Sequence, residues 1–150
     1  MRRGLWPGVA ALLALAGCGV QPSGVIVGAS PPSGAAAPGP ATTLYFLSAG
    51  RPFPVLRAGP PLSYADTLAE LAAGPTEEER ARGLGTEVPP EAAPFTVTAS
   101  GAGRVVVTLS MSPERLSTVA TEQIACTAAD RRGEVVLFGE GQGRSARCPR

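Results

Sequence analysis

The cysteines give the most specific chemical signals in this 150-residue chain. Cys18 directly follows Leu15-Ala16-Gly17 at the end of a short apolar run. A leucine three positions before a cysteine, with small residues between them, is the pattern that a bacterial lipoprotein signal peptidase cuts, and the freed cysteine then carries the lipid. We therefore expect lipidation at Cys18. Each buried methylene group of an acyl chain contributes about 0.8 kcal/mol, so two or more chains give stable anchoring.

Residues 1–17 have the remaining features of a removable signal peptide. The pair Arg2-Arg3 supplies a positive N-terminal region, and residues 5–15 form the apolar run. This run is shorter than the roughly 20 apolar residues that a transmembrane helix needs. The alternative is an ordinary secretory signal that contains a cysteine by coincidence, but the spacing of residues before the cysteine favours lipidation. We therefore expect the chain from Cys18 onward to be extracytoplasmic and anchored to the outer face of the cell membrane.

Cys126 and Cys148 remain as an even pair in a chain that we expect to be exported. Export makes a disulfide permissible, because the oxidising exterior does not keep thiols reduced. The two cysteines are 148 − 126 = 22 residues apart. Closing a loop of that size stabilises a fold by roughly 3 kcal/mol on the chain-entropy model. We expect a disulfide between Cys126 and Cys148; two free thiols, one of them buried in a helix, are the alternative.

The chain contains no histidine and no lysine, which excludes much of the usual catalytic chemistry. Catalytic triads and His-ligated zinc sites need a histidine, and Schiff bases need a lysine. Carboxylates remain, in the run Glu77-Glu78-Glu79 and in the pair Asp66 and Glu70. We interpret the run at 77–79 as surface charges that complement the dipole of a helix start, whereas a glycosidase needs two acids facing each other across a cleft. We therefore expect no catalytic, cofactor-binding or metal-binding residues.

A glycine-rich run follows the last predicted strand and raises the question of a phosphate-binding loop. It reads Gly139-Glu140-Gly141-Gln142-Gly143. Its spacing is not that of a dinucleotide-binding fingerprint, and no helix is predicted after it to supply an anion-binding N-terminus. We interpret the run as a flexible loop before the closing cysteine.

Net charge gives no indication of a nucleic-acid partner. Arginine supplies all 13 basic residues, against 12 acids, so the formal net charge is +1. Removing Arg2-Arg3 with the signal leaves 13 − 2 = 11 arginines against the same 12 acids, a net charge of −1. A near-neutral chain has no electrostatic reason to bind the phosphates of DNA or RNA.

Composition divides the chain into three parts. Residues 1–17 are the predicted signal peptide. Residues 18–42 comprise the lipidated cysteine and a linker rich in Pro, Gly, Ser and Ala that has no charged residue, which is typical of a flexible tether. Residues 43–150 contain all the sustained apolar periodicity, and these 150 − 42 = 108 residues are enough to bury a core of their own.

Apolar periodicity and turn residues predict the elements of this last part. We expect two helices after the N-caps Ser63 and Thr76, and a third that opens at Ser112-Pro113 and ends at Gly133. The order of elements predicts an α+β domain whose helices pack on a mostly antiparallel sheet. The expected strands cover 43–48, 53–57, 95–99, 104–109 and 134–138. Pro54 cannot donate a main-chain hydrogen bond to a neighbouring strand, so we expect the second of these strands at a sheet edge.

One segment of the predicted domain resembles the signature of the GerMN domain. It reads Ala73-Gly74-Pro75-Thr76-Glu77-Glu78-Glu79-Arg80-Ala81-Arg82-Gly83-Leu84. The similarity continues at Thr86 and Val88-Pro89, and it extends over roughly Thr43 to Phe138. The chain as a whole resembles a single-domain GerMN lipoprotein of actinobacteria.

The resemblance implies an α/β module on the outer side of a membrane, in a family named from spore germination and sporulation proteins. The family has no established catalytic residues to transfer to this chain. We therefore expect a non-catalytic binding module whose partners are the membrane, through the lipid, and an envelope protein or cell-wall polymer. The alternatives are a carboxylate-dependent cell-wall hydrolase and a binding protein accessory to a transporter.

Overall fold

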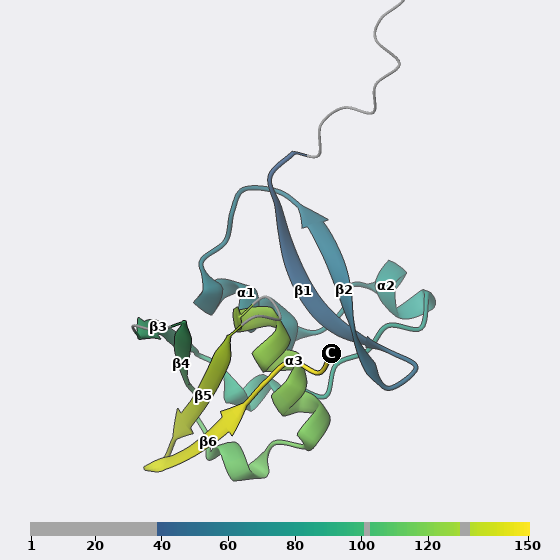
Figure 1. The fold of residues 1–150 in the computed structure, drawn as a ribbon. Helices are drawn as coiled ribbons and strands as arrows, with labels where there is room; N and C mark the ends of the chain where they lie inside the picture. The colour runs from purple at the N-terminus through teal and green to yellow at the C-terminus, as the bar shows by residue number, and fades with distance from the viewer. Residues whose placement is uncertain (1–38, 101–102, 130–132) are drawn as a thin grey trace, which may run out of the picture. The chain divides into compact units, whose positions relative to one another are not determined.

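The computed structural model describes residues 39–100, 103–129 and 133–150 (Figure 1). The predicted signal peptide, Cys18 and most of the predicted linker lie outside these residues. The first strand begins at Ala41, two residues before the predicted start of the domain. No helix of the described segments is long and apolar enough to cross a membrane.

The described elements comprise six strands, three α-helices and two short 3-10 turns. In chain order they are β1 (Ala41–Ser48), β2 (Arg51–Ala58), α1 (Tyr64–Ala73), α2 (Glu77–Ala81), η1 (Pro90–Ala92), β3 (Thr96–Ser100), β4 (Arg104–Thr108), η2 (Pro113–Arg115), α3 (Thr118–Ala129), β5 (Glu134–Gly139) and β6 (Gln142–Ala146).

The strands form two sheets, and the predicted α+β class is confirmed. β1 and β2 pair as an antiparallel hairpin, and the other sheet has the order β3-β4-β5-β6. Three of the four strand pairings are antiparallel; the pairing of β4 with β5 is parallel. Parallel strands need a crossover connection, and α3 is the helix in that connection.

Both predicted N-caps of the first two helices are confirmed. The Ser63 hydroxyl accepts a hydrogen bond from the Asp66 amide at 3.1 Å. At α2 the Thr76 hydroxyl accepts from the Glu79 amide at 3.2 Å, and the Glu79 carboxylate accepts from the Thr76 amide at 2.7 Å. This reciprocal capping box allows a helix of only five residues to begin at a fixed position.

The predicted start of the third helix is wrong. Ser112 and Pro113 open only the 3-10 turn η2, and Leu116 after it is extended, with ψ 139°. Leu116 is buried, so the chain leaves the helical conformation where this side chain enters the core. α3 then starts at Thr118, and the Ser117 hydroxyl accepts from the Ala120 amide at 3.0 Å.

The prediction of a loop over residues 139–143 is also wrong. β5 continues through Gly139 and β6 begins at Gln142, so only a two-residue turn separates two paired strands. Glu140 and Gly141 occupy this turn with φ of 49° and 75°. Two consecutive positive φ values are typical of the tight turn whose twist matches an antiparallel hairpin.

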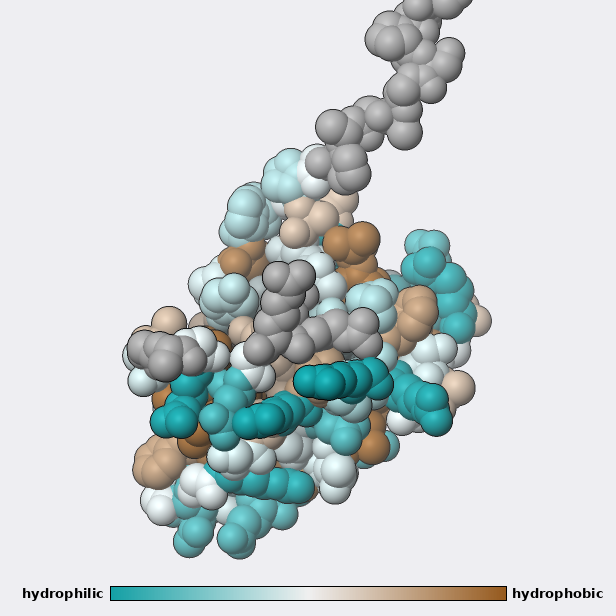
Figure 2. Space-filling view, in the orientation of Figure 1, coloured by the Kyte–Doolittle hydropathy of each residue, from teal (hydrophilic) through white to brown (hydrophobic). Residues whose placement is uncertain are grey.

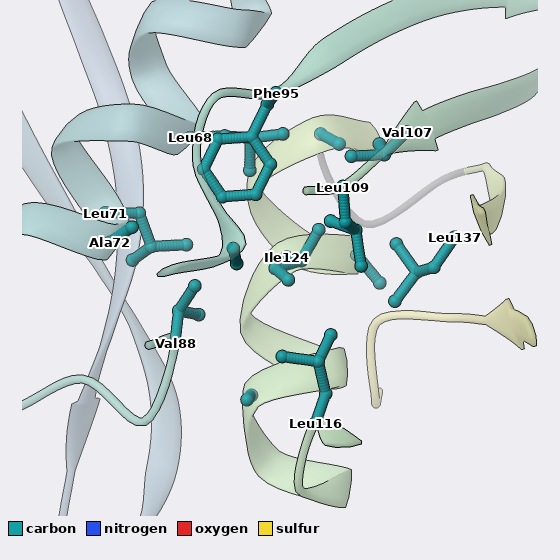
Figure 3. Packing of buried hydrophobic residues seen from close by; sticks show 14 of the residues in the cluster. Leu68, Leu71, Ala72, Val88, Phe95, Val107, Leu109, Leu116, Ile124 and Leu137 are labelled. Carbon is teal, nitrogen blue, oxygen red and sulfur yellow. The ribbon is translucent and has the colours of Figure 1, made fainter. Parts of the chain in front are cut away.

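The hydrophobic core surrounds α3. Eight of its twelve residues are buried, on several faces, because helix α3 contacts strands of both sheets. Figure 3 shows apolar side chains of α1, α3 and β5 pointing toward one another, with Ile124 of α3 near the middle. All buried members of this core lie between Leu44 and Ala146, so the described part of the chain has a core of its own.

Candidate functional site

Two of the acids singled out in the sequence converge on one arginine of β2. Glu79 receives two hydrogen bonds from the Arg57 guanidinium, at 3.2 Å from Nε and 2.7 Å from Nη2. Glu70 of α1 receives a third, at 2.8 Å from Nη1. The Arg57 guanidinium carbon also lies 5.1 Å from the centre of the Phe46 ring. This Arg57 cluster therefore ties β2 to both α1 and α2.

Within the Arg57 cluster, electrostatics favour the charged forms of Arg57 and Glu79. Hydrogen bonds from Arg57 lower the pKa of Glu79 to about 2, against the opposing effect of burial. The hydrogen bonds with Glu79 in turn raise the pKa of Arg57. At neutral pH Glu79 therefore carries no proton, and it does not serve as a general acid.

The acids of the run at 77–79 differ in their surroundings. Glu77 and Glu78 are exposed, as predicted for charges at a helix start, and Figure 2 shows hydrophilic side chains gathered over α2. Glu79 is 5 % exposed, so its interpretation as a surface charge is wrong. The capping box turns its carboxylate back toward the helix start, where it also meets Arg57. The GerMN-like segment thus supplies a buried ion-pair partner.

The first glycine of the glycine-rich run is required by packing. A Cβ atom added at Gly139 would collide with the main-chain carbonyl oxygen of Met111, so only glycine fits at this position of β5.

After β6 the chain reaches Cys148, whose sulfur lies at disulfide-bonding distance from that of Cys126. The Cα atoms are 4.5 Å apart, and Cys126 is fully buried in α3. The C-terminal segment is therefore held against the central helix.

Side chains of α3 occupy the outer edge of β1. The main-chain N–H of Tyr45 donates to the Thr127 hydroxyl at 3.2 Å. The main-chain carbonyl oxygen of Tyr45 accepts from the side-chain amide of Gln123 at 3.0 Å. Both main-chain groups of Tyr45 therefore point away from β2 toward the helix. Farther along the same edge, Leu47 exchanges two hydrogen bonds with Gly85, at 2.7 and 3.0 Å. α3 and Gly85 therefore occupy the edge of β1 at which a neighbouring strand would otherwise pair.

The other end of this edge stays open. Outward-pointing and partner-pointing residues alternate along an antiparallel strand, so Ala41 and Thr43 direct their main-chain groups to the same side as Tyr45. Within the described residues, no hydrogen bond reaches the Thr43 main chain from that side. A main-chain donor and acceptor are therefore available there to a ligand.

The outer edge of β2 has a different chemistry. Tyr45 pairs with Pro54 and Leu47 pairs with Pro52, so both prolines occupy positions whose main-chain nitrogen faces outward. Proline has no N–H group and cannot donate to an added strand. The sequence prediction that Pro54 places this strand at an edge is confirmed. Two prolines at alternate positions protect this edge from pairing.

A pocket of about 240 Å³ lies beside the open part of β1. Strand β1 forms one wall, and residues 61–64 and the start of α1 form another. Thr127 of α3 also contributes to the lining. Of the nine described residues that line it, none is charged and six carry hydroxyl groups. These are Thr42, Thr43, Tyr45, Tyr64, Thr67 and Thr127.

A larger hollow of about 470 Å³ lies between β2 and the end of α2. Its apolar lining includes Phe53 and Leu56, which are 50 % and 73 % exposed. Its carboxylate, Glu79, is already bound to Arg57. This hollow offers apolar surface without a convergent set of uncommitted polar groups, so we regard the pocket beside β1 as the candidate site.

The pocket was not predicted from the sequence. Its threonines come from β1, α1 and α3, which are far apart in the chain and read individually as ordinary strand or helix residues. The only available signal was Gln123 and Thr127, two polar residues four apart on an apolar helix face. In the described segments, no three His, Cys, Asp or Glu residues are grouped so that they could hold a metal ion.

Comparisons with known proteins assign no family. No protein-family model, curated protein or solved structure matches this chain. The resemblance to the GerMN domain therefore rests on the residues quoted above.

Proposed function

We propose that this chain is a lipid-anchored extracytoplasmic module that binds a component of the cell envelope and catalyses no reaction. The observation that carries the binding role is the pocket beside the open end of β1, whose described lining residues carry hydroxyl groups and no charge. Its polar groups suit recognition of a neutral ligand. Acid–base catalysis instead needs titratable groups with pKa values near the working pH.

The sequence before the domain supports the location. Cys18 follows a signal-like segment, and the 40 − 19 = 21 positions from 20 to 40 contain no charged residue. A flexible chain of that composition separates a lipid anchor from a folded module without binding strongly to anything itself. The folded module begins only at β1, so the pocket lies beside the first strand after this linker.

The Arg57 cluster argues against the alternative of a carboxylate-dependent wall hydrolase. Such an enzyme needs one acid that is protonated and another that is ionised, facing across a groove. Glu70 and Glu79 do approach each other, but they share the Arg57 guanidinium, and Glu79 has a pKa of about 2. The pair is better explained as a clamp that fixes α1 and α2 on β2.

The GerMN resemblance supports an assembly or binding role in the envelope. The resembling segment forms α2 with its capping box and supplies Glu79 to the Arg57 cluster. The residues of this segment therefore stabilise the fold, and we expect other parts of the domain to bind the ligand. We propose that the partner is an envelope protein or a cell-wall polymer, in sporulation or in vegetative envelope work.

Fractionation of intact cells tests this proposal. Wild-type protein with a C-terminal epitope should sediment with membranes and be degraded when protease is added to cells whose wall has been removed. The variant Cys18→Ala should leave the membrane fraction, whereas Cys148→Ser, which also loses one cysteine, should remain there. Wild-type protein that is soluble and protected inside the cell would contradict the proposal.

A further inference from the structure

The pocket beside β1 has features that point to one class of ligand. We propose that it binds a single ring of an uncharged, N-acetylated sugar chain, with the rest of the chain outside the pocket. This inference rests on the proposed envelope location, and it concerns the ligand that the same site would take. It follows from the charge, the hydroxyl groups, the open strand edge and the exposed rings of the site.

The charge of the lining favours a neutral ligand. The described residues of the lining include no Asp, Glu or Arg, so a charged ligand would lose water without gaining a counter-ion from them. The Arg57 cluster already commits its one guanidinium to two carboxylates, so it offers no free cation to an anionic ligand. A neutral ligand is therefore favoured over a phosphate, a carboxylate or an ammonium group.

The polar side chains among the described residues that line the pocket are all hydroxyls. A hydroxyl both donates and accepts, and it rotates to suit its partner. The Thr127 hydroxyl accepts from the Tyr45 amide, so its own hydrogen remains available for donation. The Thr67 hydroxyl donates to the Ser63 carbonyl oxygen at 2.9 Å, which leaves its lone pairs available to accept. The pocket therefore has one hydroxyl that can donate and one that can accept, and both complement the hydroxyl groups of a sugar.

The open edge of β1 adds an amide-like pairing. The Thr43 N–H and C=O point to the pocket side of the strand and have no described partner there. The acetamido group of an N-acetylated sugar carries the same donor and acceptor as a peptide group. It can therefore pair with this edge as a short piece of added strand would. A sugar that lacks the acetamido group would leave these main-chain groups to water.

The rim supplies apolar surface. Tyr64 is 59 % exposed and Leu62 is 37 % exposed, and both line the pocket. A sugar ring has an apolar face of C–H groups that packs on an aromatic ring or an alkyl side chain. The volume of about 240 Å³ is below the roughly 300–1,000 Å³ of sites for drug-sized ligands. It is therefore suited to one ring of a longer chain.

An unusual distribution of aromatic residues makes the test direct. Tyr45 and Tyr64 are the only tyrosines of the chain, and both line the pocket. Trp6, the only tryptophan, lies in the predicted signal peptide. In the full-length protein with Trp6→Phe, purified in detergent, all tyrosine emission therefore comes from the proposed site. This protein is titrated with the trimer of N-acetylglucosamine and with the glucose trimer that lacks acetamido groups.

We expect a saturable change in tyrosine emission with the N-acetylated trimer and at least five-fold weaker binding of the glucose trimer. Tyr64→Ala should weaken binding of the N-acetylated trimer at least ten-fold, and Thr43→Val should weaken it several-fold. Thr98→Val, an exposed threonine of β3, is the matched control and should bind like the parent protein. Circular dichroism checks that each variant is folded.

Three results would overturn the inference. The first is no saturable change with the N-acetylated trimer, and the second is unchanged binding by folded Tyr64→Ala. The third is binding to purified wall material that disappears when its peptides, but not its glycan strands, are removed, because the pocket would then recognise an extended peptide. None of these measurements depends on lipidation, so a failure of the proposed location would appear in the fractionation of cells and not here.

Discussion

The side-chain amide of Gln123 lies 3.0 Å from the Tyr45 carbonyl oxygen, so a helix residue takes the place of a neighbouring strand. Gln123 is fully buried, and its side-chain carbonyl oxygen accepts from the main-chain N–H of Glu87 at 2.8 Å. One side chain thus satisfies two main-chain groups from different parts of the chain. The arrangement closes the middle of the β1 edge and leaves its beginning open as the candidate site.

The first prediction concerns this residue. Gln123→Met keeps the volume but leaves the Tyr45 carbonyl and the Glu87 amide without their partner. Each unsatisfied buried group costs about 1–3 kcal/mol, so we expect the free energy of unfolding to fall by about 2–4 kcal/mol. Chemical denaturation measures it. The neighbouring Glu122→Gln, which removes no described contact, should change it by less than about 0.5 kcal/mol. Equal stability of the two variants would refute the role assigned to Gln123.

The second prediction is a pH dependence of stability that arises from Glu79. Its pKa is about 2 in the folded protein, against an ordinary value of 4.5. The ion pair with Arg57 therefore stabilises the fold fully above pH 4.5, and this stability is lost as pH falls from about 4.5 to about 2. We expect a loss on the order of 2 kcal/mol over this window.

Two variants isolate this contribution. Glu79→Gln should be less stable than the wild type at neutral pH and should lose less stability on acidification, because its side chain no longer takes up a proton. Glu78→Gln, at an exposed position of the same helix, should keep the wild-type pH profile. If the profiles of the two variants coincide, another group is responsible.

The third prediction concerns the Cys126–Cys148 pair. A bond across 22 residues stabilises a fold by roughly 3 kcal/mol, which for a domain of this size corresponds to roughly 10 °C or more in the midpoint of thermal unfolding. We expect reductant to lower the wild-type midpoint by about this amount. Cys148→Ser should unfold near the reduced wild type, and reductant should not affect it. A wild-type midpoint that is insensitive to reductant would mean that the pair is not oxidised.

The fourth prediction concerns self-association through β2. Changing Pro52 and Pro54 together to Thr restores two outward N–H donors on an edge strand, so we expect larger species in sedimentation velocity than the wild type forms. Pro60→Thr, in the exposed segment after the strand, is the matched control and should sediment like the wild type. A double variant that sediments like this control would show that the prolines do not protect the edge.

Elements with strong local signals were predictable from the sequence. The Ser63 and Thr76 caps and Pro54 of β2 act within a few residues, so their types and positions indicated the right structure. Ser112-Pro113 carried an equally good helix-start signal and was misleading, because burial of Leu116 ends the turn after three residues. A tertiary contact of this kind has no local pattern.

The Arg57 cluster and the pocket depend on residues far apart in the chain. Arg57 and Glu79 are 22 residues apart, and Tyr45 and Thr127 are 82 apart. The sequence displayed Glu79 only as one of three adjacent acids, and helix geometry alone does not say which of them turns inward. The partition of strands into two sheets likewise depends on the position of α3 between them.

The central claim is that the chain is a lipid-anchored module outside the cell, and intact mass of the protein purified from its native membrane tests it most directly. We expect a chain that begins at Cys18 and carries a lipid adduct, and whose mass rises by two hydrogen atoms on reduction. An unmodified chain that retains residues 1–17 would contradict this account. The domain would then have no membrane anchor, and its binding and activity would have to be tested in solution.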